Sequence, residues 1–173
     1  MEKTDKALIP IIILLFIAGA FIQVIFPAWS GDTCESQVVT IVGTDEDDVL
    51  TGTANDDVIH GLAGNDVIKG LQGNDRICGG SGNDKLYGQA GNDRLNGGEG
   101  NDEIFGGLGD DFLYGWGGND FLEGNEGDDT LWGHGGDDFL DGGVGYDKLS
   151  GDFPYGIPED NECINGEEIE LCK

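Results

Sequence analysis

Residues 79–105 read GGSGNDKLY, GQAGNDRLN and GGEGNDEIF, three successive units of nine residues. The same pattern runs from Gly43 to Ser150 as twelve units, with no insertion or deletion. Position 1 of every unit is glycine, position 6 is aspartate, and position 8 is leucine or isoleucine. A fixed short period predicts a repeat architecture in which each unit is one structural element that packs on its neighbours.

The residue types indicate how each unit is folded. Position 4 is glycine in the last ten units, and position 5 is asparagine or aspartate in all but one, so both positions favour tight turns. We expect six residues of a unit to form a turn and three to form a strand, with only position 8 pointing inward. Two units would complete one coil, so twelve units predict about six coils, stacked at a strand spacing of about 4.8 Å.

The composition restricts the possible partners. The chain has 35 acidic and 8 basic residues, for a net charge of −27, which argues against a nucleic-acid partner. Only 38% of the residues are hydrophobic, and 33 of the 173 are glycine. Such a chain is disordered unless its charge is neutralised as well as its apolar surface buried, and a multivalent cation would achieve the neutralisation.

The unit from Gly79 to Tyr87 matches the G-G-x-G-x-D-x-U-x consensus, in which U is a large aliphatic residue, as do the units from Gly97 and Gly106. The array therefore resembles the RTX family of hemolysin-type calcium-binding repeats. The resemblance implies an all-β fold, a right-handed parallel β-roll, with calcium held between stacked turns by position-6 aspartates and turn carbonyls. Carried over position by position, the metal ligands are Asp48, Asp57, Asp66, Asp75, Asp84, Asp93, Asp102, Asp111, Asp120, Asp129, Asp138 and Asp147.

Some units depart from the consensus. Thr44, Glu46, Thr53 and Asn55 replace glycine in the first two units, which puts their calcium sites in doubt and suggests a degenerate cap. An ion between each unit and the next but one gives at most about ten ions. We expect the chain to be disordered without calcium and to fold when calcium binds. The alternative is that the aspartates form turns without any ion.

An apolar segment, residues 7–29, precedes the array and follows Lys3 and Lys6. As a helix it would be long enough to cross a bilayer, with the lysines inside and the repeats outside. Residues 1–30 are therefore predicted to be a single-pass membrane anchor or, because Ala18-Gly19-Ala20 is a possible cleavage site, a signal peptide. Either reading places the repeats outside the cell, secreted or held at the cell surface.

Residues 31–42 are expected to form a capping strand and residues 151–173 a C-terminal cap or tail, with the repeats between them at 43–150. The four cysteines favour two disulfides, Cys163 with Cys172 and Cys34 with Cys78, and free thiols are the alternative.

We find no catalytic pattern, and His60 and His134 are expected to be surface residues, so the chain is not expected to be an enzyme. Aromatic residues recur at outward positions, either as a partner surface or packed along the strands. The sequence thus predicts a calcium-binding module outside the cell. A structural or adhesive surface protein that calcium stiffens is the alternative.

Overall fold

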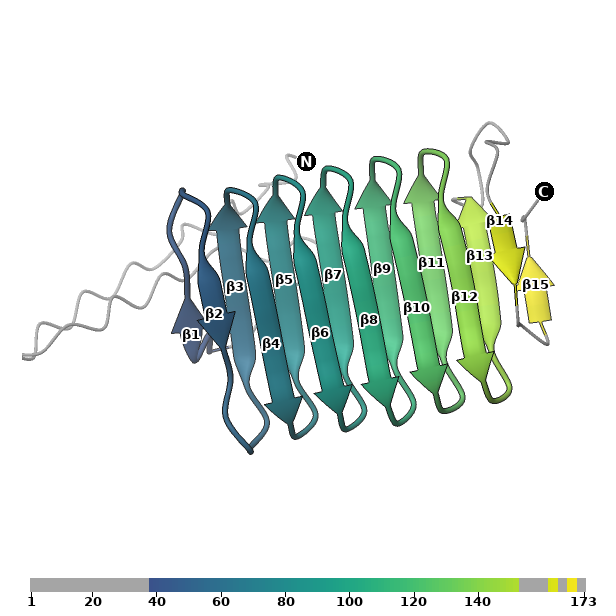
Figure 1. Ribbon diagram of the computed structural model, residues 1–173, viewed down its shortest axis with the longest axis horizontal. Coiled ribbons are helices and arrows are strands. Elements are labelled where there is room, and N and C mark those ends of the chain that lie inside the picture. Colours follow the sequence, from purple (N-terminus) through teal and green to yellow (C-terminus); the bar gives the residue numbers. More distant parts are fainter. Residues whose placement is uncertain (1–37, 153–161, 165–167, 171–173) are drawn as a thin grey trace, which may run out of the picture.

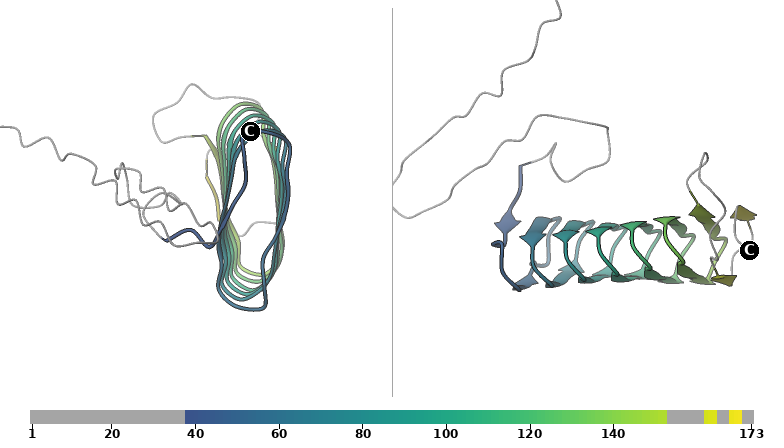
Figure 2. Two further views of the ribbon diagram at one scale, coloured as in Figure 1. Left: turned by 90° about the vertical axis from the view of Figure 1, so that its left-hand side faces the viewer. Right: turned by 90° about the horizontal axis from the view of Figure 1, so that it is seen from above.

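The computed structural model describes residues 38–152, 162–164 and 168–170, which form fifteen strands and no helix. The strands build two parallel sheets that face each other (Figure 1). Seen along the axis, successive coils superpose as a flattened oval, and from above they follow one another in a row (Figure 2). The all-β parallel solenoid of about six turns predicted from the period is therefore confirmed. The predicted N-terminal helix lies outside the described residues.

Odd-numbered strands form one sheet and even-numbered strands the other, because the chain alternates between the sheets at every turn. The odd strands are β1 (Ile41–Val42), β3 (Val58–Ala63), β5 (Arg76–Ser81), β7 (Arg94–Glu99), β9 (Phe112–Gly117), β11 (Thr130–Gly135), β13 (Lys148–Asp152) and β15 (Glu168–Glu170). The even strands are β2 (Val49–Thr51), β4 (Val67–Gln72), β6 (Lys85–Ala90), β8 (Glu103–Leu108), β10 (Phe121–Glu126), β12 (Phe139–Val144) and β14 (Glu162–Ile164). Strand neighbours are two units apart, as when Leu95 pairs with Leu113.

The strands are longer than expected. Each of the ten strands β3 to β12 has six residues, from position 7 of one unit to position 3 of the next, and only positions 4–6 remain for the turn. The prediction of a three-residue strand and a six-residue turn was wrong, because the glycine-rich positions 1–3 were read as turn. They are held extended by pairing with the coils on both sides, as when Gly80 pairs with Leu62 and Gly98.

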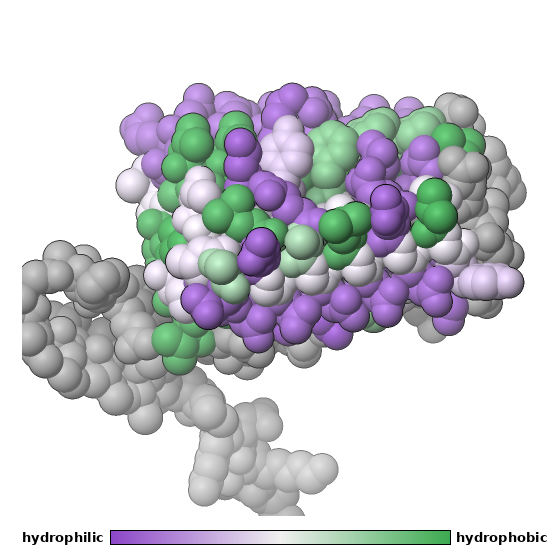
Figure 3. Space-filling model, turned by 60° about the horizontal axis from the view of Figure 1, so that its bottom comes forward, coloured by the Kyte–Doolittle hydropathy of each residue, from purple (hydrophilic) through white to green (hydrophobic). Residues whose placement is uncertain are grey.

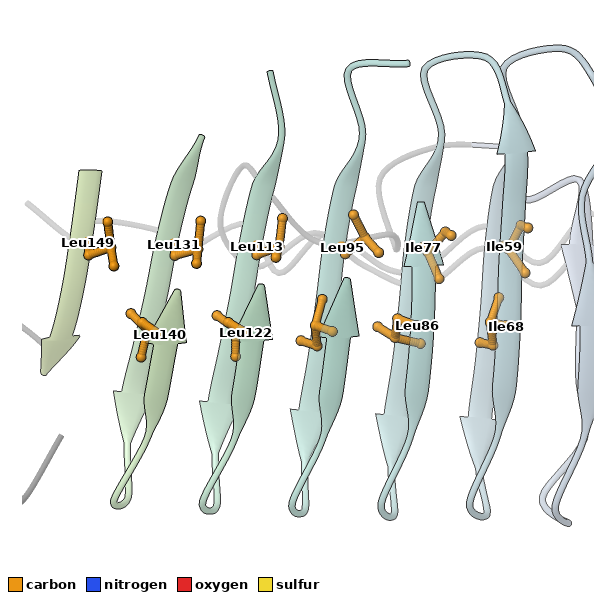
Figure 4. Packing of buried hydrophobic residues seen from close by; sticks show 11 residues of the cluster. Ile59, Ile68, Ile77, Leu86, Leu95, Leu113, Leu122, Leu131, Leu140 and Leu149 are labelled. Carbon is orange, nitrogen blue, oxygen red and sulfur yellow. The ribbon is translucent and has the colours of Figure 1, made fainter. Parts of the chain in front are cut away.

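The core is a double row of position-8 residues, one from each sheet (Figure 4). Eleven of them are at most 1% exposed: Ile59, Ile68, Ile77, Leu86, Leu95, Ile104, Leu113, Leu122, Leu131, Leu140 and Leu149. The expectation that only position 8 points inward was too narrow. The position-1 glycine of these strands and the position-6 aspartate are buried as well. Each coil after the first thus buries two aliphatic side chains together with two carboxylates.

The outward aromatic residues pack along the strands, as the second of the two predictions for them stated; the other was a partner surface. Phe121 and Phe139 stack with ring centroids 5.0 Å apart. Trp116 stacks on His134 at 4.5 Å. His134 is only 8% exposed, so its expected position at the surface was wrong. Such cross-strand pairs stabilise neighbouring coils against each other.

The two ends of the roll continue the same pairing. At the N-terminal end β1 pairs with β3, and at the C-terminal end β14 and β15 pair with β12 and β13. Cys78 is not a free thiol, but both predicted disulfides include residues outside the described part, so these pairings stay predictions. No helix among the described residues is long and apolar enough to span a bilayer, and residues 7–29 lie outside that part.

Candidate metal centre: two columns of aspartates

The turns stack into two columns, one at each edge of the flattened roll. The first column contains Asp48, Asp66, Asp84, Asp102, Asp120 and Asp138, and the second contains Asp57, Asp75, Asp93, Asp111, Asp129 and Asp147. Figure 3 shows hydrophilic residues as a nearly continuous band along the lower edge of the roll. In both columns the position-6 aspartates are buried, except Asp48.

One oxygen of each buried carboxylate is fixed by the backbone. The N–H of a position-6 aspartate donates to Oδ1 of the aspartate 18 residues later, as from Asp93 to Asp111. Ten such bonds of 2.7–2.9 Å run through both columns. A hydrogen bond to a charged acceptor is worth roughly 1.5–3 kcal/mol, so the bond orients each carboxylate firmly.

The other oxygen, Oδ2, has no hydrogen-bond partner in the middle eight units. These are Asp66, Asp75, Asp84, Asp93, Asp102, Asp111, Asp120 and Asp129, each at most 3% exposed. A buried polar atom that lacks a partner is costly, and eight of them in regular positions need a physical explanation.

The position-1 glycine explains where these oxygens lie. A β-carbon on Gly88 would collide with Oδ2 of Asp93 and would lie 2.7 Å from the carbonyl oxygen of Gly106. The same holds at Gly106, where the β-carbon would meet Oδ2 of Asp111 and the carbonyl oxygen of Gly124. A carboxylate oxygen and a carbonyl oxygen from the next coil therefore approach the same point. Both are hydrogen-bond acceptors, so a proton or a cation between them would stabilise the arrangement.

Burial raises the pKa values of these aspartates, although the N–H donor on Oδ1 lowers them and neighbouring carboxylates raise them further. The pKa is raised for Asp66 and Asp75, to about 6 for Asp84, Asp93 and Asp129, to about 7 for Asp102 and Asp120, and to about 8 for Asp111. The columns thus hold protons most tightly in the middle of the roll, where water is furthest away.

A second ladder covers the outside of each turn. The position-5 side chain accepts a bond from the position-5 N–H of the unit 18 residues later, as from Asn83 to Asn65 at 2.9 Å. The ladder ends at Tyr146, whose N–H donates to Asp128 but whose side chain offers no amide or carboxylate oxygen to a further coil. These bonds keep the turns in register and leave the position-6 carboxylates directed inward.

The atoms available as metal ligands determine which ions the columns can bind. Among the described residues no three histidine, cysteine, aspartate or glutamate side chains come together as a metal cluster. Any ion in the columns would therefore need main-chain carbonyl oxygens besides the carboxylates. Oxygen-only ligands suit hard cations such as calcium, and exclude the nitrogen and sulfur ligation of zinc.

The sequence located the aspartates but not their orientation. The structure places all twelve predicted position-6 residues in the two columns, with Asp48 and Asp57 in different surroundings described below. The sequence did not reveal that the position-1 glycines form the floor of the site, that is, the backbone surface on which each inward Oδ2 lies. The signal for this role was that position 1 is glycine in all twelve units, because only a residue without a β-carbon leaves room for the carboxylate.

Position 2 was another feature that the sequence left hidden. Its backbone is left-handed in the last ten units, even where the residue is not glycine, as at Leu62 with φ 88° and Trp116 with φ 79°. Left-handed backbone is uncommon for such residues.

The fold and its turns define a parallel β-roll with stacked aspartate ladders, an arrangement consistent with calcium binding. The family model for the RTX calcium-binding nonapeptide repeat matches the chain in four copies, at residues 40–68, 51–86, 87–122 and 114–149. The chain belongs to this family. The match identifies a non-catalytic repeat module, and among curated proteins none matches the chain.

Proposed function

We propose that the chain is a calcium-binding module that works outside the cytoplasm and folds when calcium binds. The observation that carries this proposal is the set of eight buried Oδ2 atoms that lack a donor, of which all but that of Asp102 share their space with a carbonyl oxygen of the next coil. In this reading the position-6 aspartates and the position-1 carbonyls are ligands. A calcium ion would supply the positive charge that these acceptors need.

The number of ions follows from the stacking. Each column has six aspartates and therefore five spaces between successive turns, so both columns together offer about ten sites. About ten divalent cations would offset much of the −27 charge of the chain. Carbonyls and carboxylates in turns form an adaptable cage, which favours calcium over magnesium because magnesium requires a near-ideal octahedron.

The proposed location rests on the family and on the N-terminal segment. RTX repeats are typical of secreted proteins. Residues 7–29 are apolar enough for export or for membrane attachment, whether or not they are cleaved. Extracellular modules commonly bind calcium with dissociation constants of about 10⁻⁴–10⁻³ M, so such sites would fill outside the cell. The chain would then remain unfolded until it had been exported.

Adjacent aspartates provide a matched test. Asp111→Asn keeps the Oδ1 acceptor that binds the N–H of Asp93 but removes the charge at the inward Oδ2. We expect it to bind one calcium ion fewer, as counted by native mass spectrometry, and to require at least about tenfold more calcium to fill the sites beside it. In excess chelator its stability should not fall, because the change removes a buried charge.

Asp110→Asn is the control. Asp110 is exposed, and its Oδ1 accepts a bond from the N–H of Asp128, which asparagine can also accept. The number of bound ions should not change. Equal ion counts for the Asp111 and Asp110 variants would contradict the proposed ligand role of the inward carboxylates.

A further inference from the structure

We infer that the turns of the first coil are stable without calcium, because Thr44 and Thr53 donate hydrogen bonds to the carboxylates that calcium would otherwise bind. This inference rests on the proposed function and limits it to part of the array. Both threonines are at position 2 of their units, where the two N-terminal units depart from the repeat.

The first observation is the state of the carboxylates. Oδ2 of Asp48 accepts bonds from the Thr44 N–H at 2.6 Å and the Thr44 hydroxyl at 2.9 Å. Oδ2 of Asp57 accepts the same two bonds from Thr53, at 2.7 and 2.8 Å. The corresponding oxygen in the next eight units has no donor. The acceptor that needs a cation elsewhere is therefore already satisfied by two donors in the first coil.

The threonine hydroxyl also binds the other side of the turn. Oγ1 of Thr44 accepts a bond from the N–H of Glu46, and Oγ1 of Thr53 accepts one from the N–H of Asn55, each at 3.2 Å. The hydroxyl thus links position 4 to the position-6 carboxylate within one unit. A local side-chain bridge of this kind stabilises a turn by itself and needs no ion.

The backbone provides a second and independent observation. In the last ten units position 2 and position 4 both have positive φ, whereas Thr44, Glu46, Thr53 and Asn55 do not. Threonine is β-branched, and left-handed backbone is strongly disfavoured for such residues. The position-2 N–H can then turn toward the carboxylate.

The consequence is a smaller calcium capacity than the number of spaces suggests. Asp48 and Asp57 are hydrogen-bond acceptors rather than calcium ligands, so the two spaces that follow them stay metal-free. The roll then binds about eight ions, one for each buried Oδ2 from Asp66 to Asp129 that lacks a donor. The N-terminal end keeps its turns when the calcium concentration falls.

Native mass spectrometry of the full chain in calcium tests this count. The wild-type chain is expected to bind about eight ions, and Asp48→Asn with Asp57→Asn should leave that number unchanged. Restoring glycine with Thr44→Gly, Glu46→Gly, Thr53→Gly and Asn55→Gly should add two ions. Adding Asp48→Asn and Asp57→Asn to these four changes should remove the same two ions.

The glycine variants keep the test decisive if the asparagine variants fold poorly. A loss of two ions on Asp48→Asn and Asp57→Asn in the wild-type chain overturns the inference and leaves the proposed function intact. An unchanged count after the four glycine substitutions also overturns it. A wild-type chain that binds no calcium overturns the proposed function, and the inference fails with it.

Discussion

Excess chelator at about pH 8 is expected to abolish most of the strand signal of the chain in far-ultraviolet circular dichroism, and calcium should restore it. Without a cation the charged columns place carboxylate and carbonyl oxygens against each other along most of the roll beyond the first coil. The core provides only one aliphatic side chain per unit, so it is not expected to offset this repulsion. Full strand signal in chelator at this pH would refute coupled folding.

In the same experiment, acid should fold the chelated chain in place of calcium. The raised pKa values of the inward aspartates predict this direction of the pH dependence. The folded roll raises the pKa of its inward aspartates, to about 6 at Asp84, about 7 at Asp102 and about 8 at Asp111, whereas an unfolded aspartate titrates near 3.9. The folded state therefore holds more protons in this range. Its stability is fully present below about pH 4 and is lost as the pH rises through about 6 to 8.

We accordingly expect the chelated chain to regain strand signal when the pH is lowered to about 4.5, as a monomer by sedimentation. Protons and calcium both stabilise the folded roll, so the calcium concentration at the midpoint of folding should fall as the pH falls. A chelated chain that becomes more stable as the pH rises from about 5 to 8 would contradict this account of the columns.

Gly88→Ala is expected to have the second large effect. The new methyl group would enter the space shared by Oδ2 of Asp93 and the carbonyl oxygen of Gly106. Overpacking costs about 1–3 kcal/mol, and the loss of an ion should add to it. In calcium, urea unfolding should therefore show a free energy of unfolding lower by at least about 2 kcal/mol, and native mass spectrometry should show one ion fewer.

Gly117→Ala is the matched control. Gly117 also lies on a strand and has no positive φ, but a β-carbon there would meet only the carbonyl oxygen of Gly98, at 3.8 Å. Its effect should remain within about 0.5 kcal/mol, with no change in the number of bound ions. Similar losses for the two alanine variants would show that the position-1 glycines act through strand flexibility rather than as the floor of an ion site.

Much of the fold could be predicted from the sequence because each unit repeats the same local choice. The aspartate at position 6, such as Asp93, and the aliphatic residue at position 8, such as Leu95, recur every nine residues. That period predicts stacked coils with the aspartates in columns and the aliphatic residues in a core. The strand boundaries could not be predicted, because Gly97 and Gly98 have the composition of a turn. Only pairing with the coils on either side, as between Gly98 and Trp116, shows that they are extended.

The candidate site was predictable in its residues and not in its geometry. Position-6 aspartate is also a good turn residue, so the sequence could not show that Asp93 points inward over Gly88. Thr44 was recognised as a departure from the repeat, but its bonds to Asp48 depend on a backbone conformation that the sequence does not specify. The two C-terminal strands were also missed, because β14 and β15 are short segments outside the nine-residue period.

The central claim is that cations lie inside the two columns, between the inward carboxylates and the carbonyls of the next coil. Crystals of the full chain grown in calcium and measured at a long X-ray wavelength would test it by anomalous scattering. The account predicts two rows of calcium peaks, spaced by about the 4.8 Å between strands, one of them beside Oδ2 of Asp93 and the carbonyl oxygen of Gly106. An ordered roll with no anomalous peak in either column would contradict it.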